Sequence, residues 1–150
     1  LWLAVKPKAL QSLQAQAQKR GINPHRLVAA PYQKPVQRFI AAMACADLFL
    51  DTAGFNAGAI GVLALNAGLP LITIAGNRFC ARMGASLCNA VHQPQLITTT
   101  PEAYQQKAIE LATTPGAIAQ LRTQLHSDPQ GLPLFQQRLW VSSLVAALNG

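Results

Sequence analysis

A glycine-rich segment in the middle of the chain constrains the fold most. Residues 47–61 read Asp-Leu-Phe-Leu-Asp-Thr-Ala-Gly-Phe-Asn-Ala-Gly-Ala-Ile-Gly, a short apolar run that ends in Asp51 and Thr52 and is followed by three glycines. This order predicts a strand, a tight turn and the start of a helix. Backbone N–H groups in the first turn of a helix have no intrahelical partners, and the helix dipole places partial positive charge there. The segment therefore predicts an anion site that needs no charged side chain.

The glycine spacing matches neither the GxGxxG pattern of dinucleotide-binding folds nor the Gly-Lys-Ser/Thr of a P-loop. This motif alone therefore does not identify the fold class, and the rest of the chain is needed. Apolar runs alternate with segments of helical period along the whole chain. This alternation indicates an α/β, doubly wound parallel sheet with helices on both faces. We expect strands over residues 1–5, 26–30, 48–51, 70–74 and 96–98, helices over residues 9–19, 35–46, 59–67, 79–91, 101–113 and 115–125, and a last amphipathic helix with Leu139, Trp140, Leu144 and Leu148.

Length and composition indicate one globular domain. The 150 residues, 51% of them hydrophobic and 11% charged, suffice for one buried core, so we expect a single Rossmann-like domain over residues 1–150. The longest apolar runs are broken by glycine, proline or polar residues, which argues against a membrane-spanning helix. The chain begins at Leu1, without an initiator Met and directly in an expected strand, so we expect it to be a fragment of a longer protein.

The net charge of +7 raises the question of a nucleic-acid partner. The twelve Lys and Arg residues are scattered and lack the aromatic interleaving of single-strand binders, so we expect none. Cys45, Cys80 and Cys88 show neither CxxC spacing nor a nearby His. We therefore expect no metal, no disulfide and a cytoplasmic protein with reduced cysteines.

Candidate ligand-binding residues lie in three loops, over residues 31–34, 52–58 and 75–78. Each loop follows an expected strand, and ligands of doubly wound sheets bind where such loops meet at the carboxyl ends of the strands. Lys34 and Arg78 are candidates for neutralising a phosphate there, and solvated loop cations are the alternative.

Other polar residues favour structural roles. We expect Arg82 to pair with Asp47 or Asp51 rather than to reach a ligand. We expect Asp51 to cap the turn that follows it rather than to act as an acid, a base or a ribose ligand. The three histidines lie outside motif distance of a nucleophile or a second ligand: His25, His92 and His126. The residues alone thus predict a nucleotide- or phosphosugar-binding α/β domain without a catalytic pair.

The most specific stretch of the chain runs over residues 47–87. Asp-Leu-Phe-Leu-Asp-Thr at 47–52 precedes Asn56, and Leu-Asn-Ala-Gly-Leu-Pro-Leu-Ile-Thr-Ile-Ala-Gly-Asn-Arg-Phe-Cys-Ala-Arg-Met-Gly-Ala-Ser-Leu follows at 65–87. This order resembles the C-terminal catalytic half of the O-GlcNAc transferase and SPINDLY family of glycosyltransferases, and the resemblance extends over essentially the whole chain. It implies a GT-B fold of two Rossmann domains, with this chain forming most of the C-terminal one, and tetratricopeptide repeats upstream that engage protein acceptors.

The resemblance implies transfer of a sugar from a UDP- or GDP-linked donor to Ser or Thr of a protein, without a metal. The family's turn usually carries a His-Thr-Thr or Thr-rich triplet on the donor diphosphate, and here these positions are Gly58, Ala59 and Ile60. The family's acidic residue beyond the triplet is replaced by Leu63, and a His in the preceding segment by Phe39. Lys34 lies near the family's Lys/His-containing loop but out of register with it. The predicted contacts to the nucleotide and its diphosphate are then the loop cations Lys34 and Arg78, Asn56 and the backbone of the triplet. No catalytic residue is implied in this chain.

Three hypotheses follow from these departures. In the first, the full protein is a working transferase that holds the diphosphate at residues 58–60 by backbone N–H groups alone. In the second, the chain is a degenerate, inactive relative that serves as a binding or protein-interaction module, because each missing hydrogen bond to a phosphate costs about 1.5–3 kcal/mol. In the third, an unrelated nucleotide-binding domain has converged on the glycine-rich turn.

Overall fold

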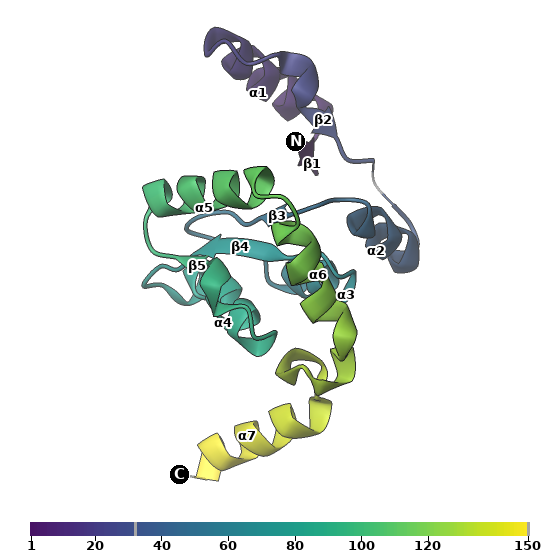
Figure 1. Cartoon of the computed structure of the whole chain (residues 1–150), viewed down its shortest axis with the longest axis vertical. Coiled ribbons are helices and arrows are strands. Elements are labelled where there is room, and N and C mark those ends of the chain that lie inside the picture. Colours follow the sequence, from purple (N-terminus) through teal and green to yellow (C-terminus); the bar gives the residue numbers. More distant parts are fainter. Residues whose placement is uncertain (32, 150) are drawn as a thin grey trace. The chain divides into compact units, whose positions relative to one another are not determined.

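The computed structural model describes residues 1–31 and 33–149 (Figure 1). They divide into two compact units, Leu1–Phe39 and a larger one that begins at Ile40. Helix α2 (Val36–Ala44) spans the junction in the sequence.

The N-terminal unit pairs two short parallel strands beside one helix. Its elements are β1 (Trp2–Leu3), α1 (Pro7–Lys19), a 3-10 turn (Pro24–Arg26) and β2 (Val28–Ala29). The side chain of Gln14 in α1 donates to the carbonyl of Leu27 (3.0 Å), which joins the helix to the start of β2. The strand predicted over 26–30 is shorter because the 3-10 turn occupies its beginning. The Asn23 side chain caps this turn by accepting the N–H of His25 (3.0 Å).

The C-terminal unit holds a three-stranded parallel sheet in the order β3, β4, β5. Its regular elements are β3 (Phe49–Leu50), α3 (Ala59–Asn66), β4 (Leu71–Ile74), α4 (Met83–Ala90), β5 (Ile97–Thr98), α5 (Pro101–Thr113), α6 (Ala117–Ser127) and α7 (Gln137–Asn149). Figure 1 shows α5 along one face of β4 and α4 along the other. The predicted α/β class, with parallel strands and helices on both faces, is confirmed.

The core of this unit forms around the central strand. Leu71 and Ile72 of β4 have no exposed surface. Apolar side chains from the helices pack around Leu71, and the cluster includes Leu65, Leu87, Val91, Leu96, Leu111, Leu121 and Leu125. The start of α5 follows its sequence signal, since the Thr100 hydroxyl accepts the N–H of Ala103 (3.1 Å) ahead of Pro101.

The helix predicted over residues 79–91 is interrupted. Phe79–Ala81 forms a 3-10 turn, and α4 begins only at Met83. The carbonyl of Cys80 accepts the N–H of Asn56, and the carbonyl of Ala81 accepts the N–H of Gly76 (2.8 Å each). Both carbonyls are therefore occupied by distant donors, and a continuous helix would need them for its own hydrogen bonds. Within the described residues, none of the helices combines the length and apolar character needed to cross a membrane.

Candidate functional site

The turn after β3 presents the N-terminus of α3. Gly58 is the N-cap residue and supplies no side-chain cap. The first N–H bonded within the helix's first turn is that of Val62, which donates to the carbonyl of Gly58 (3.2 Å). The N–H groups of residues 59–61 come before it and have no acceptor within the helix. The sequence predicts an anion site at this helix start, and the structure shows N–H groups without helical acceptors there.

The buried carboxylate of Asp51 accepts hydrogen bonds from the backbone of the glycine-rich turn. Asp51, 5% exposed, accepts the N–H groups of Thr52 (2.9 Å) and Ala57 (2.7 Å) through Oδ1. Its Oδ2 accepts the hydroxyl of Thr73 in β4 (2.7 Å). The prediction that Asp51 caps the following turn is confirmed, and both of its oxygens are engaged within the protein.

Asn56 joins the turn to α4. Its side chain, in a residue only 2% exposed, donates through Nδ2 to the carbonyl of Thr52 (2.9 Å) and accepts the N–H of Gly84 through Oδ1 (3.1 Å). The sequence placed Asn56 among the nucleotide contacts. In the structure both ends of its amide make hydrogen bonds within the chain, so its visible role is to fix the turn.

The second predicted loop meets the glycine-rich turn. Besides the hydrogen bond between the N–H of Asn56 and the carbonyl of Cys80, the Cys80 thiol donates to the carbonyl of Gly54 (3.3 Å). Arg78, two residues before Cys80, is exposed. The fold thus brings Arg78 into the loop next to the start of α3, as the sequence predicted.

Arg82 does not pair as predicted. Among the described residues the only ion pair joins Lys107 and Glu110 (2.8 Å), so the expected contact of Arg82 with Asp47 or Asp51 is wrong. The Arg82 side chain is exposed, whereas Asp51 is buried and held by neutral donors.

The six predicted contacts divide between the two units. Asn56, Gly58, Ala59 and Ile60 lie in one turn of the C-terminal unit, and Arg78 lies in the loop beside it. Lys34 is exposed and belongs to the N-terminal unit. The predicted loop over residues 31–34 includes Tyr32, which lies outside the described residues.

Tyr104 and Cys88 add to the surroundings of Asp51. The Tyr104 hydroxyl in α5 donates to the backbone carbonyl of Asp51 (2.9 Å). Burial, and then the charge of Asp51, raises the pKa of Tyr104 to about 12 and that of Cys88 to about 12. Both groups therefore stay protonated beside the carboxylate. Sequence reasoning assigned neither of them to the site, because residues far apart in the chain carry no local signal of contact.

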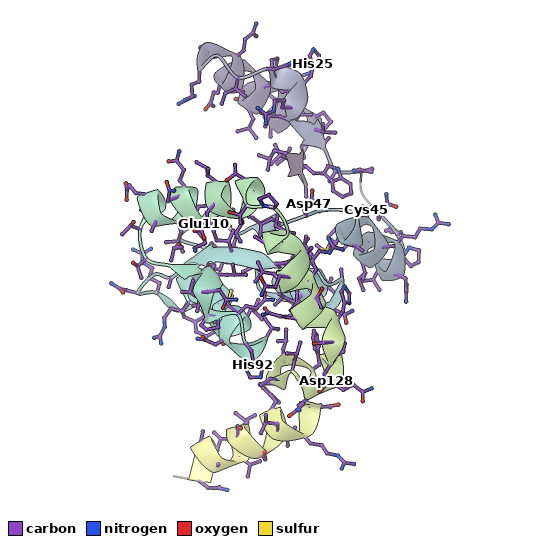
Figure 2. All side chains as sticks on the ribbon, viewed as in Figure 1. His25, Cys45, Asp47, His92, Glu110 and Asp128 are labelled. Atoms are coloured by element: carbon purple, nitrogen blue, oxygen red, sulfur yellow. The ribbon has the colours of Figure 1, made fainter. Side chains whose placement is uncertain are left out.

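A separate surface cavity of about 440 Å³ lies between the ends of α4 and α6. His92, which adopts a positive φ of 58°, and Asp128 both line it (Figure 2). None of the lining residues belongs to the glycine-rich turn, so this cavity is not the predicted anion site.

Comparison with known proteins decides the family. The model of Glycosyl transferase family 41 matches residues 1–144. The chain belongs to glycosyl transferase family 41. The predicted resemblance to the O-GlcNAc transferases is thereby confirmed at the level of the family.

Two curated relatives of the chain are named as N-acetylglucosaminyltransferases. The Arabidopsis thaliana protein, probable UDP-N-acetylglucosamine-peptide N-acetylglucosaminyltransferase SEC, is 29% identical over 149 residues, which are 96% of this chain and 15% of that protein. The Caenorhabditis elegans UDP-N-acetylglucosamine-peptide N-acetylglucosaminyltransferase is 27% identical over 139 residues, 90% of this chain and 12% of that protein. This chain thus spans only a small part of the length of these two relatives.

A solved structure supports the fold. A mutant of the Thermobaculum terrenum O-GlcNAc transferase matches with a TM-score of 0.85 and 24% identity, over 95% of this chain and 27% of that one. The chain therefore has the Rossmann-like fold of part of a GT-B glycosyltransferase.

Proposed function

We propose that this chain binds the nucleotide-sugar donor of a protein O-glycosyltransferase, which transfers the sugar to Ser or Thr of a protein. The observation that carries the proposal is the start of α3, where the N–H groups of residues 59–61 have no helical acceptor and no side chain caps them, in a chain of family 41. Both curated relatives are named for UDP-N-acetylglucosamine, which favours UDP over GDP as the nucleotide. Protein acceptors, upstream tetratricopeptide repeats, a relation to the SPINDLY transferases and a cytoplasmic location belong to the same proposal.

The chemistry follows from charge. When the acceptor hydroxyl attacks the anomeric carbon, the bond from that carbon to the diphosphate oxygen breaks, and the bonding electrons leave with the nucleotide. The developing negative charge falls on phosphate oxygens at the N-terminus of α3, where backbone N–H groups and the helix dipole stabilise it. The exposed Arg78 adds a bidentate donor in the adjacent loop. The base that takes the hydroxyl proton would come from outside this chain.

Backbone donors can contribute to donor binding without any side-chain hydroxyl. Hydrogen bonds to a charged group are worth about 1.5–3 kcal/mol each. Two such bonds at residues 59–61 therefore contribute about 3–6 kcal/mol, a factor of about 10²–10⁴ in the dissociation constant.

A second candidate function is an inactive binding module. The observation that favours it is the apolar surface of the two loops: Ile60 is 44% exposed, Phe55 74% and Phe79 82%, where the family's turn carries hydroxyls on the diphosphate. In this case the fold persists and the affinity for a nucleotide is lost.

Titration calorimetry of the full-length protein separates the two candidates, with UDP as ligand and uridine as the control that lacks phosphates. The test variant is Gly58→Asp. A Cβ at Gly58 has room, with Met83 Cε at 3.9 Å, and Asp is a favoured N-cap whose carboxylate binds the N–H groups of the helix's own first turn. The variant should therefore retain or gain stability while its affinity for UDP falls at least about tenfold. The matched control is Asn66→Asp, which adds the same charge at the other, exposed end of α3, about 12 Å away.

Tight UDP binding that Gly58→Asp removes and Asn66→Asp retains would support the transferase. No heat with UDP or GDP at millimolar concentrations would refute it and leave the binding module. Equal weakening by both Asp variants would mean that general charge repulsion, rather than occupation of the helix N-terminus, is being measured.

A further inference from the structure

The conformation of the glycine-rich turn depends on one carboxylate. The turn includes Gly54, with a φ of +81°, and ends at Gly58, and glycine has the most backbone freedom of any residue. Of the side chains, only that of Asp51 is hydrogen-bonded to the N–H of Ala57, the residue directly before Gly58. Through Oδ2 the same carboxylate is tied to Thr73 in the central strand. Asp51 thus connects the glycine-rich turn to the buried central strand of the sheet.

The packing of α4 holds the Asp51 carboxylate in one position. A Cβ at Gly84 would collide with Asp51 Oδ2 and with the Thr73 hydroxyl, so the first turn of α4 lies directly against the pair. The Gly84 N–H in turn is bound by Asn56. Strand β4, helix α4 and the turn therefore fix the Asp51 side chain from three sides.

We propose that Asp51 is a positioning residue of the donor site. By holding the Ala57 N–H it sets the direction of the backbone at residues 58–61, so that their N–H groups converge on a diphosphate before the ligand arrives. A flexible turn would have to be ordered on binding, and that ordering weakens affinity. The inference rests on the proposed function, because a diphosphate must bind there for the orientation to matter.

Three substitutions in the full-length protein test the role. Asp51→Ala removes the acceptor. Asp51→Asn keeps Oδ1, and its Nδ2 faces the Thr73 hydroxyl, which can accept as well as donate. Thr98→Val removes a buried hydroxyl that donates to the Thr73 carbonyl of the same sheet (2.8 Å) in a hydrogen bond that does not involve Asp51, so it is the matched control for a purely structural effect.

The readouts are the dissociation constant for UDP, measured below the melting temperature of each variant, and amide hydrogen exchange of residues 52–61 without ligand. We expect Asp51→Ala to weaken UDP binding about tenfold or more and to speed exchange in the turn. Asp51→Asn should rescue both to within about threefold of wild type, because it retains the hydrogen-bond acceptor. Thr98→Val should lower the melting temperature while the dissociation constant for UDP stays within about threefold of wild type.

Each result supports or contradicts the positioning role of Asp51. If Asp51→Ala binds UDP as wild type does, or if Thr98→Val weakens UDP binding as much as Asp51→Ala does, Asp51 acts only on stability and the inference is wrong while the proposed function stands. If wild type binds no UDP, the proposed function fails and the inference fails with it. Should Asp51→Ala not fold, Asp51→Ser replaces it. The Ser side chain is one bond shorter than that of Asp, so its hydroxyl oxygen lies further from the Ala57 N–H than Oδ1 does. Wild-type affinity for UDP in that variant would overturn the inference.

Discussion

Replacing Gly84 with alanine tests how closely the start of α4 packs on the sheet. A Cβ at this buried position would collide with Oδ2 of Asp51 and with the Thr73 hydroxyl, and it would lie 2.8 Å from Thr73 Cβ. Carbon atoms in good contact are about 3.5–4.0 Å apart. The partners are a buried hydrogen-bonded pair, Thr73 on β4 and Asp51 directly after β3, so they cannot rotate away as the end of a flexible side chain would. The hydrogen bond between Thr73 and Asp51 must give way instead.

The cost of Gly84→Ala has two parts. Overpacking a core by one methyl group costs about 1–3 kcal/mol. Leaving a buried polar group without its partner costs about 1–3 kcal/mol more. The better helix propensity of alanine returns about 1 kcal/mol. We expect a loss of about 3 kcal/mol in the free energy of unfolding, which for a chain of this size lowers the melting temperature by about 6–12 °C.

Urea denaturation of wild type and Gly84→Ala measures this loss, and calorimetry gives the melting temperatures. The control is Ser86→Ala on the exposed side of the same helix, which should change stability by less than about 0.5 kcal/mol. Thr73→Ala in the Gly84→Ala background removes the nearest colliding atom, so the double variant should lose less than the sum of the two single losses. Wild-type stability in Gly84→Ala, or strictly additive losses, would refute the packing argument.

Two further predictions concern the pH dependence of the free energy of unfolding and the hydrogen bonds of Arg122. Burial, and then the charge of Asp51, raises the pKa of Cys88 from 9.0 to about 12, so above pH 9 the unfolded chain binds fewer protons than the folded one. The free energy of unfolding should then fall by about 1 kcal/mol per pH unit between pH 9 and 11, and Cys88→Ala should remove that part of the slope in urea denaturation; an unchanged slope would contradict it. Arg122 donates to the carbonyls of Ala46 (2.6 Å) and Ala44 (2.9 Å), and Arg122→Lys, which lacks the planar fork, should cost about 1–2 kcal/mol, whereas the exposed Arg82→Lys should cost nothing measurable. Equal stabilities of these two Lys variants would show that the fork does not matter.

Local sequence signals predicted the structure correctly where one short segment determines its own conformation. The apolar run, the glycine-rich turn and the Ala/Leu-rich segment became β3, the turn and α3, and Thr100 with Pro101 marked the start of α5. The capping role of Asp51 also followed from residue type, because Asp readily accepts N–H groups of the turn after it.

Long-range hydrogen bonds explain what the sequence did not predict. The helix over 79–91 broke because Asn56 and Gly76 donate to carbonyls that its first turn would need. The hydrogen bonds of the Asn56 side chain with Thr52 and Gly84 were not predicted, because they depend on a packing of α4 that no local pattern encodes. The wrong pairing of Arg82 has the same origin, because proximity along the chain does not fix the direction of a long side chain.

The most direct test of the account is hydrogen–deuterium exchange of the full-length protein with and without UDP. The account predicts that UDP slows exchange of the backbone amides of residues 58–61, where the N–H groups of residues 59–61 have no acceptor within the helix, and that uridine does not. Protection by UDP of another segment alone, with the amides of residues 58–61 exchanging as fast as before, would contradict the claim that the start of α3 holds the donor diphosphate.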